Sequence, residues 1–218
     1  MYVPPLFAET DPQAIASLID RHPLATLVLV KDGVAQADHI PFVRLAGVAT
    51  GERLVAHVSK SNDTWRSIGA GCEALLVFAG GSAYISPSLY PSKKTTHEVV
   101  PTWNYASVHL RGRITCCHDS AEKRHIVEQL TRKMESGRSE PWAVSDAPAA
   151  YIDRMLAGIV ALRFDIEAMT SKFKASQNRS VEDREGVVAG LAKDPATQEG
   201  AQLAAGMREL TALAPIKS

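Results

Sequence analysis

The chain has 218 residues, enough for one domain with an appendage or for two small domains. Its 24 lysine and arginine residues balance its 24 aspartate and glutamate residues, which excludes a whole-chain attraction to nucleic acid or acidic lipid. The apolar fraction of 45% is that of an ordinary globular protein with a hydrophobic core.

The sequence predicts neither a signal peptide nor a membrane span. Residues 1–5 lack a basic region followed by an apolar run, and no apolar stretch is long enough to cross a bilayer. The cysteines number three, and the neighbours Cys116 and Cys117 would point to opposite faces of a strand, which places them poorly for a disulfide. We therefore expect a cytoplasmic protein with free thiols and no membrane contact.

Turn residues and hydrophobic periodicity divide the first half of the chain into strands and short helices. Asp11 and the proline after it begin a helix, which the proline after His22 ends. Pro41 interrupts a return strand and favours an edge or a bulge, and Asn62 can cap a short helix. The strands predicted here are residues 24–30, 34–43, 53–59 and 73–79.

The second half mixes strands with more helices. Asp119 with Glu122 has the pattern of a capping box, and Ser180 can cap a later helix. Strands are predicted at residues 107–117 and 158–169, and helices after residues 119, 148 and 180 and around Leu203, Met207 and Leu210. Because short turns join most strands, we predict a mainly β fold with peripheral α (α+β), built as an antiparallel barrel.

A central stretch, residues 83–105, gathers aromatic rings, hydroxyls and an amide around prolines. Aromatic faces and short polar groups at strand ends suit a flat, partly apolar ligand, and residues 91–99 between them can form a lid. The alternative is a kinked strand pair whose aromatic residues are core or subunit contacts.

Two polar clusters are candidates for ligand binding. Residues 59–62 (Ser-Lys-Ser-Asn) leave a strand and enter a helix N-terminus, which suits a phosphate, although plain helix capping accounts for the serines and asparagine too. Residues 172–179 (Lys-Phe-Lys-Ala-Ser-Gln-Asn-Arg) either bind a ligand or form a solvated linker. The histidines lack zinc-site spacing, so no metal is predicted, and no dinucleotide, P-loop or nucleophile-elbow motif identifies catalytic residues.

The order of motifs resembles a known family. They are Met-Tyr-Val-Pro-Pro-x-Phe at residue 1, residues 23–28, 39–42 (His-Ile-Pro-Phe) and 56–58, Asn62 with Trp65, and residues 83–87, 100–105, 141–142 and 176–179. Together they resemble the PaiB family, described as FMN-binding negative transcriptional regulators, over residues 1 to about 192. The resemblance implies a split β-barrel that dimerises and holds FMN between subunits. Leu89 and Phe173 depart from the tryptophans common in the family.

The resemblance also implies a set of FMN-binding residues. Ser59, Lys60, Ser61 and Asn62 would hold the phosphate; His39, Ile40 and Pro41 would line the isoalloxazine edge, with His57 behind them. Lys174, Gln177 and Asn178 would reach the ligand from the partner chain, and Trp65 completes the set. The split barrel would cover residues 1–170, and residues 171–218 would form a linker and a helical tail.

Three functions follow from the resemblance. The first is an FMN-binding homodimer acting as a negative transcriptional regulator; the others are a flavin-dependent oxidoreductase and a haem-binding split barrel. Direct DNA binding is possible but is supported neither by charge nor by a reading motif.

Overall fold

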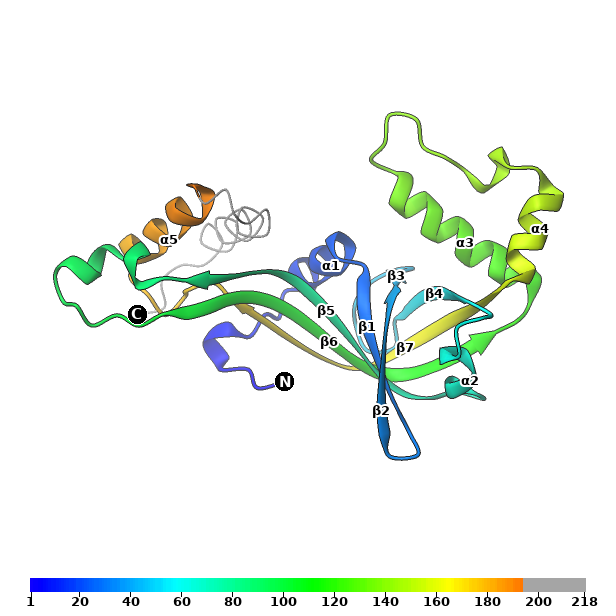
Figure 1. Cartoon of the computed structure of the whole chain (residues 1–218), viewed down its shortest axis with the longest axis horizontal. Helices are drawn as coiled ribbons and strands as arrows, with labels where there is room; N and C mark the ends of the chain where they lie inside the picture. The colour runs from blue at the N-terminus through cyan, green and yellow to red at the C-terminus, as the bar shows by residue number, and fades with distance from the viewer. Residues whose placement is uncertain (194–218) are drawn as a thin grey trace. The chain divides into compact units, whose positions relative to one another are not determined.

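The computed structural model describes residues 1–193, which divide into two compact units (Figure 1). Of these residues, unit 1 comprises 1–10, 79–108 and 170–193, and unit 2 comprises 11–78 and 109–169. The predicted helix around Leu203, Met207 and Leu210 lies outside the described residues. Within them, no helix combines the length and the apolar character needed to span a membrane.

Seven strands form one sheet in the order β2-β1-β5-β6-β7-β4-β3. The strands are β1 (Leu24–Lys31), β2 (Val34–Pro41), β3 (Val43–Arg44), β4 (Arg53–Ser59), β5 (Cys72–Ile85), β6 (Thr102–Cys117) and β7 (Ile159–Lys174). The helices are α1 (Pro12–Arg21), α2 (Thr64–Ile68), α3 (Ser120–Glu135), α4 (Ala149–Ala157) and α5 (Val181–Lys193). The strand pairs β1–β2, β1–β5, β3–β4 and β4–β7 are antiparallel, which confirms the predicted α+β class.

The helix caps, the hairpin turn and the edge-strand proline predicted from the sequence are present in unit 2. The Asp11 carboxylate accepts a hydrogen bond from the Gln13 N–H at 2.9 Å and begins α1, and Asp119 does the same for the Glu122 N–H at the start of α3. Asp32 and Gly33 have φ of 53° and 78°, the left-handed pair of a tight hairpin turn between β1 and β2. Pro41 lies at the end of β2, which is an edge strand, as its missing N–H requires.

Three strands are clearly longer than predicted. β5 does not end at Gly80 and Gly81 but continues to Ile85, β6 begins at Thr102 and not at Ser107, and β7 continues past Met169 to Lys174. Glycine weakens a strand without ending it, so it was a poor stop signal here. The predicted return strand instead breaks at Phe42, which is fully buried and donates its N–H to the Pro23 carbonyl at 2.9 Å.

The end of β6 corrects a second expectation. Cys117, not Cys116, packs in the core with Val55 and Ala161, and the predicted alternation shifts by one residue after Ile114. The Cys116 thiol instead lies against the Trp65 carbonyl oxygen at 3.5 Å. The three cysteines are free, as predicted.

In unit 1, α5 covers one side of the strand ends. Ile85, Tyr90 and Ala175 pack with Val187 and Leu191 of this helix. Residues 87–89 form a 3-10 turn. Residues 91–94, which begin the predicted lid, form a second 3-10 turn. The Ser92 N–H and hydroxyl donate to the Asp183 carboxylate at 3.0 and 2.8 Å, which fastens this part of the predicted lid to α5.

Candidate functional site

The first predicted cluster lies entirely within unit 2. Ser59 ends β4, residues 60–62 form the turn that follows, and Trp65 lies in α2. In this turn the Asn62 N–H donates to the Ser59 carbonyl at 3.0 Å, and the Ser61 N–H donates to the Ser59 hydroxyl oxygen at 3.1 Å. The side chains of Ser59, Lys60 and Ser61 are exposed, so the turn presents two hydroxyls and one ammonium group to solvent.

Asp38 directly precedes the His-Ile-Pro motif, and its carboxylate connects β2 to this turn. One oxygen of its carboxylate accepts hydrogen bonds from the Asn62 amide at 2.5 Å and from the Thr64 hydroxyl at 2.9 Å. The Asn62 amide oxygen in turn accepts from the Thr64 N–H at 2.8 Å. Burial alone would raise the pKa of Asp38, but the hydrogen bonds from Asn62 and Thr64 hold that pKa below its ordinary value. The carboxylate therefore stays ionised and fixes the turn beside β2.

Trp65 supports the turn from the other side. Its indole N–H donates to the Lys60 carbonyl at 3.0 Å, and its ring meets the His118 ring edge-on at 5.7 Å. These contacts hold the Lys60 backbone. Within residues 1–193 the Lys60 ammonium has no hydrogen-bond or ion-pair partner, so it is available to an anion.

The strand residues of the first cluster differ in how far their side chains are accessible to a ligand. His39 and Pro41 are exposed, whereas Ile40 is 2% exposed and belongs to the core, so only its backbone can meet a ligand. His57 keeps solvent contact on β4, but the protein atoms around its ring desolvate it and lower its pKa. His57 is therefore a neutral imidazole at pH 7.

The second predicted cluster lies in unit 1, where β7 ends. The Lys174 ammonium donates to the Trp103 carbonyl at 2.8 Å and to the Thr102 hydroxyl. The Gln177 amide is engaged in its own turn, because its oxygen accepts from the Ala175 N–H at 2.7 Å and its NH₂ donates to the Phe173 carbonyl at 2.5 Å. Asn178 is exposed. The prediction that these three residues meet a flavin from a second chain stays a prediction.

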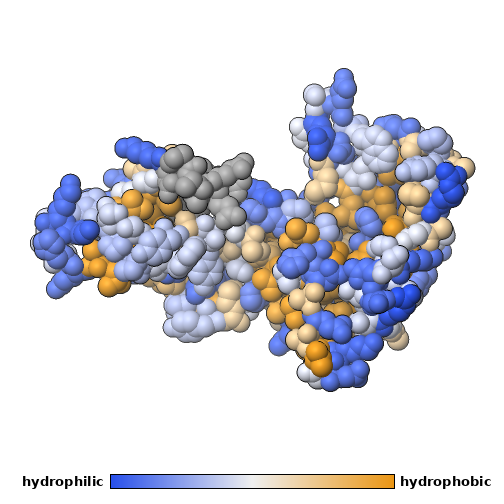
Figure 2. Space-filling model, in the orientation of Figure 1, coloured by the Kyte–Doolittle hydropathy of each residue, from blue (hydrophilic) through white to orange (hydrophobic). Residues whose placement is uncertain are grey.

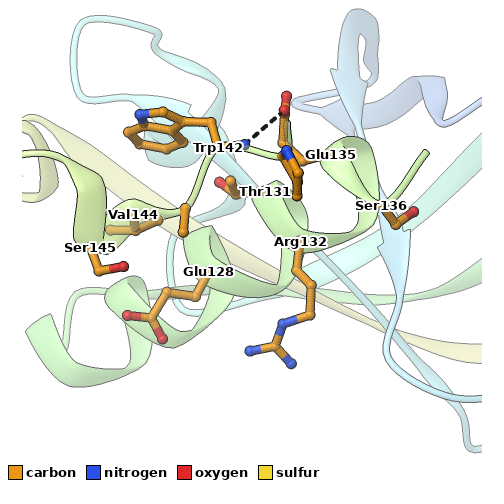
Figure 3. Close-up of a pocket in the computed structure, with 10 residues that line it drawn as sticks. Glu128, Thr131, Arg132, Glu135, Ser136, Trp142, Val144 and Ser145 are labelled. Atoms are coloured by element: carbon orange, nitrogen blue, oxygen red, sulfur yellow. Dashed lines mark hydrogen bonds between the residues drawn. The ribbon is translucent and has the colours of Figure 1, made fainter. Parts of the chain in front are cut away.

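A separate pocket of about 400 Å³ lies in unit 2 between α3 and the loop that follows it (Figure 3). Trp142 and Val144 line it from the loop and Glu128 and Arg132 from α3, and the Trp142 N–H donates to the Glu135 carboxylate at 3.1 Å. None of the twelve predicted site residues lines this pocket.

Sequence reasoning missed the residues that hold the first cluster in place. Asp38, Thr64 and His118 contact it from β2, α2 and the end of β6. Asp38 directly precedes the His-Ile-Pro motif, which was an available signal. Nothing in the sequence shows that its carboxylate meets Asn62, since 24 residues separate them.

Comparisons with known proteins identify related sequences. A family profile described as "Putative FMN-binding domain" matches residues 1–168. Protease synthase and sporulation protein PAI 2 of Bacillus subtilis is 30% identical over 194 residues, which cover 88% of this chain and 89% of that protein. Uncharacterized protein AN0679 of Emericella nidulans is 30% identical over 226 residues, with 88% and 90% coverage.

Solved structures share the fold. The FAD and haem binding protein from Mycobacterium smegmatis superposes with a TM-score of 0.60 at 24% identity, over 84% of this chain and 80% of that one. The flavocytochrome Anf3 from Azotobacter vinelandii gives a TM-score of 0.54 at 17% identity, over 77% and 69%. With the profile match and the relationship to PAI 2, these findings establish that the chain belongs to the PaiB family and has the split-barrel fold of flavin-binding proteins.

Proposed function

We propose that this protein binds FMN, with the phosphate at the turn formed by residues 59–62. The observation that carries the proposal is the Lys60 ammonium, which has no hydrogen-bond or ion-pair partner among residues 1–193. Lys60 is flanked in sequence by two exposed serines, on a turn that Asp38 and Trp65 hold in place. A phosphate oxygen accepts hydrogen bonds from hydroxyls and from an ammonium group, and the charge-assisted bond is the stronger. The donor set therefore fits a phosphate monoester.

The neighbouring residues fit the remainder of a flavin. His39, Pro41 and the Ile40 backbone lie on β2, which the Asp38 carboxylate ties to the phosphate-binding turn, so they would border the isoalloxazine ring. His57, on β4, would lie behind them. The flavin supplies redox chemistry when bound, and the residues of this chain bind it, orient it and limit its contact with water.

We propose further that the protein is a homodimer. Leu24, Val30 and Val34 in the β1–β2 hairpin have exposed fractions of 58%, 68% and 62%, and Figure 2 shows hydrophobic surface near the hairpin tip. A second chain packed against the hairpin would remove apolar surface of these side chains from water. Light scattering that finds an FMN-loaded monomer would contradict this.

For the biological role we propose negative transcriptional regulation in the cytoplasm, as the family is described, with the flavin as the sensing group. The balance of 24 basic and 24 acidic residues does not favour direct DNA binding, so regulation through a partner protein is the form we propose.

The test of the phosphate site compares FMN with riboflavin, which lacks the phosphate. Lys60→Ala removes one charge-assisted contact, worth about 1.5–3 kcal/mol, so FMN affinity should fall about ten- to a hundredfold while riboflavin affinity changes little. Lys31→Ala, a change of an exposed lysine in the same unit, is the matched control and should leave both affinities unchanged. Equal losses for the two flavins in Lys60→Ala would show that Lys60 does not touch the phosphate.

A second candidate is a haem-handling or flavin-dependent oxidoreductase. The observation that favours it is His57, because a neutral imidazole with solvent contact can ligate haem iron, and the Mycobacterium smegmatis neighbour is described as binding both FAD and haem. The absorption spectrum of the purified protein separates a flavin from a haem. Oxidation of NADH or NADPH through the bound flavin would favour the enzyme over the regulator.

A further inference from the structure

A group of cations, for which residues 1–193 supply no counter-ion, lies in unit 1 where β7 ends. Lys172 and Lys174 stand two residues apart on this strand, so they share a face, and Arg179 follows in the next turn. Within residues 1–193, no carboxylate lies within ion-pair distance of any of the three. Desolvation by burial, together with the positive charges of Lys172 and Arg179, lowers the pKa of Lys174.

Lys172 is the most unusual member of the group. It is only 8% exposed, and its ammonium lies 5.1 Å from the centre of the Tyr105 ring and 5.8 Å from that of Tyr2. Of its three N–H donors, one makes a long 3.4 Å contact to the Tyr2 carbonyl. Because a buried ammonium is costly unless it is paired and hydrogen-bonded, this arrangement is incomplete without an anion.

Flat aromatic surface adjoins these cations. Trp103 and Tyr105 share one face of β6, since they are two residues apart, and the Trp103 carbonyl is the acceptor for Lys174. The Trp103 ring meets the Tyr84 ring at 6.1 Å, and these two residues are 56% and 52% exposed. An exposed aromatic pair beside unpaired ammonium groups complements a ring that carries a negative charge.

We propose that this site binds a planar aromatic carboxylate, with the carboxylate between Lys172 and Lys174 and the ring against Trp103 and Tyr105. The ligand is distinct from the flavin proposed above, whose phosphate we assign to Lys60 in unit 2. This assignment competes with the predicted contact of Lys174 with a flavin of the partner chain, and the experiment below decides between the two. The protein would then bind a second ligand, about the size of benzoate, that acts as an effector.

The rival explanation is purely structural. Lys172 would then serve only as a cation packed between Tyr2 and Tyr105, and Lys174 only as a donor that joins β7 to β6. In that case the lysines stabilise unit 1, and no carboxylate binds to them.

The experiment is calorimetric titration of the full chain with benzoate, and with benzamide as its neutral counterpart. Benzoate should bind saturably, and benzamide at least about tenfold more weakly, because it lacks the charge that the lysines recognise. Lys174→Met and Lys172→Met should each weaken benzoate about tenfold or more. Lys94→Met, which removes an exposed lysine of the same unit, should bind benzoate as the unsubstituted protein does.

Melting temperatures and FMN titrations separate the remaining outcomes. If Lys172→Met has a lower melting temperature than the unsubstituted protein, the conclusion rests on Lys174→Met, because Lys174 is only partly buried. Unchanged benzoate affinity in Lys174→Met, or equal binding of benzoate and benzamide, overturns the inference. So does a loss of FMN affinity in Lys174→Met together with competition between benzoate and FMN, since the lysines would then serve the flavin. Benzoate binding in a protein that binds no FMN would overturn the proposed function and leave this inference standing.

Discussion

Asp38→Asn tests whether the Asp38 carboxylate organises the turn at residues 59–62, where we propose that the phosphate binds. In the structure, one carboxylate oxygen accepts from Asn62 at 2.5 Å and from Thr64 at 2.9 Å, and the other accepts from the His39 N–H at 2.8 Å. An asparagine has one acceptor oxygen and one NH₂ group, so in either orientation its NH₂ faces a donor. At least one charge-assisted hydrogen bond is therefore lost. The hydrogen bonds that remain are made to a neutral amide and no longer to a carboxylate.

The expected cost follows from that loss. A hydrogen bond to a charged group contributes about 1.5–3 kcal/mol, and partial solvent access puts Asp38 at the lower end, near about 1–2 kcal/mol. A chain of this length should then melt about 2–8 °C lower. FMN affinity should fall as well, because the turn that carries Lys60 is no longer fastened to β2 through Asn62 and Thr64.

The assay is thermal unfolding followed by circular dichroism on the ligand-free protein, with FMN titration of the same samples. Asp63→Asn is the matched control: Asp63 pairs with Arg66 at the surface, its side chain is 81% exposed, and its loss should change stability by less than about 0.5 kcal/mol. Equal melting temperatures for Asp38→Asn and Asp63→Asn would refute the reasoning.

The pH dependence gives an independent check on Asp38. The pKa of Asp38 is lower in the folded protein than its ordinary value of 3.8, so its contribution to stability is complete above that ordinary pKa. The contribution is lost as the pH falls through the lowered folded pKa. The stability difference between the unsubstituted protein and Asp38→Asn should therefore shrink below about pH 4.

Three further results are expected. Gly112→Ala should destabilise unit 2 by at least about 3 kcal/mol in chemical unfolding, because its Cβ would lie 1.9 Å from the Asp165 carbonyl oxygen, whereas Gly137→Ala, with nothing within 4 Å, should be nearly neutral. Gly186→Ala would place a Cβ 2.4 Å from the Leu89 carbonyl oxygen, so hydrogen exchange of residues 87–94 should accelerate; unchanged protection would mean that α5 does not fasten this turn. Gel shifts at physiological salt should show weak or no sequence-selective DNA binding, and nanomolar selective binding would overturn the charge argument.

Local rules were sufficient for much of the fold. The starts of α1 and α3 at Asp11 and Asp119 and the hairpin turn at Asp32 and Gly33 depend on side chains and backbone conformations within a few residues, and all are as predicted. The strand ends at Ile85 and Lys174 were not predicted, because neighbouring strands of the sheet extend a ladder through glycines and polar residues that are poor strand formers alone.

The sequence alone determined the family, the alternation of strands, and the polar turn at residues 59–62 as a candidate phosphate site. Only the tertiary structure decided which groups are available. Asn62 is engaged by Asp38, Lys60 has no partner among residues 1–193, and Ile40 on the neighbouring β2 is buried. It also decided that Lys172 lies between aromatic rings rather than in solvent. The physical reason is that hydrogen-bond partners and burial are set by residues 24 to 170 positions away, whereas a sequence pattern reports only on near neighbours.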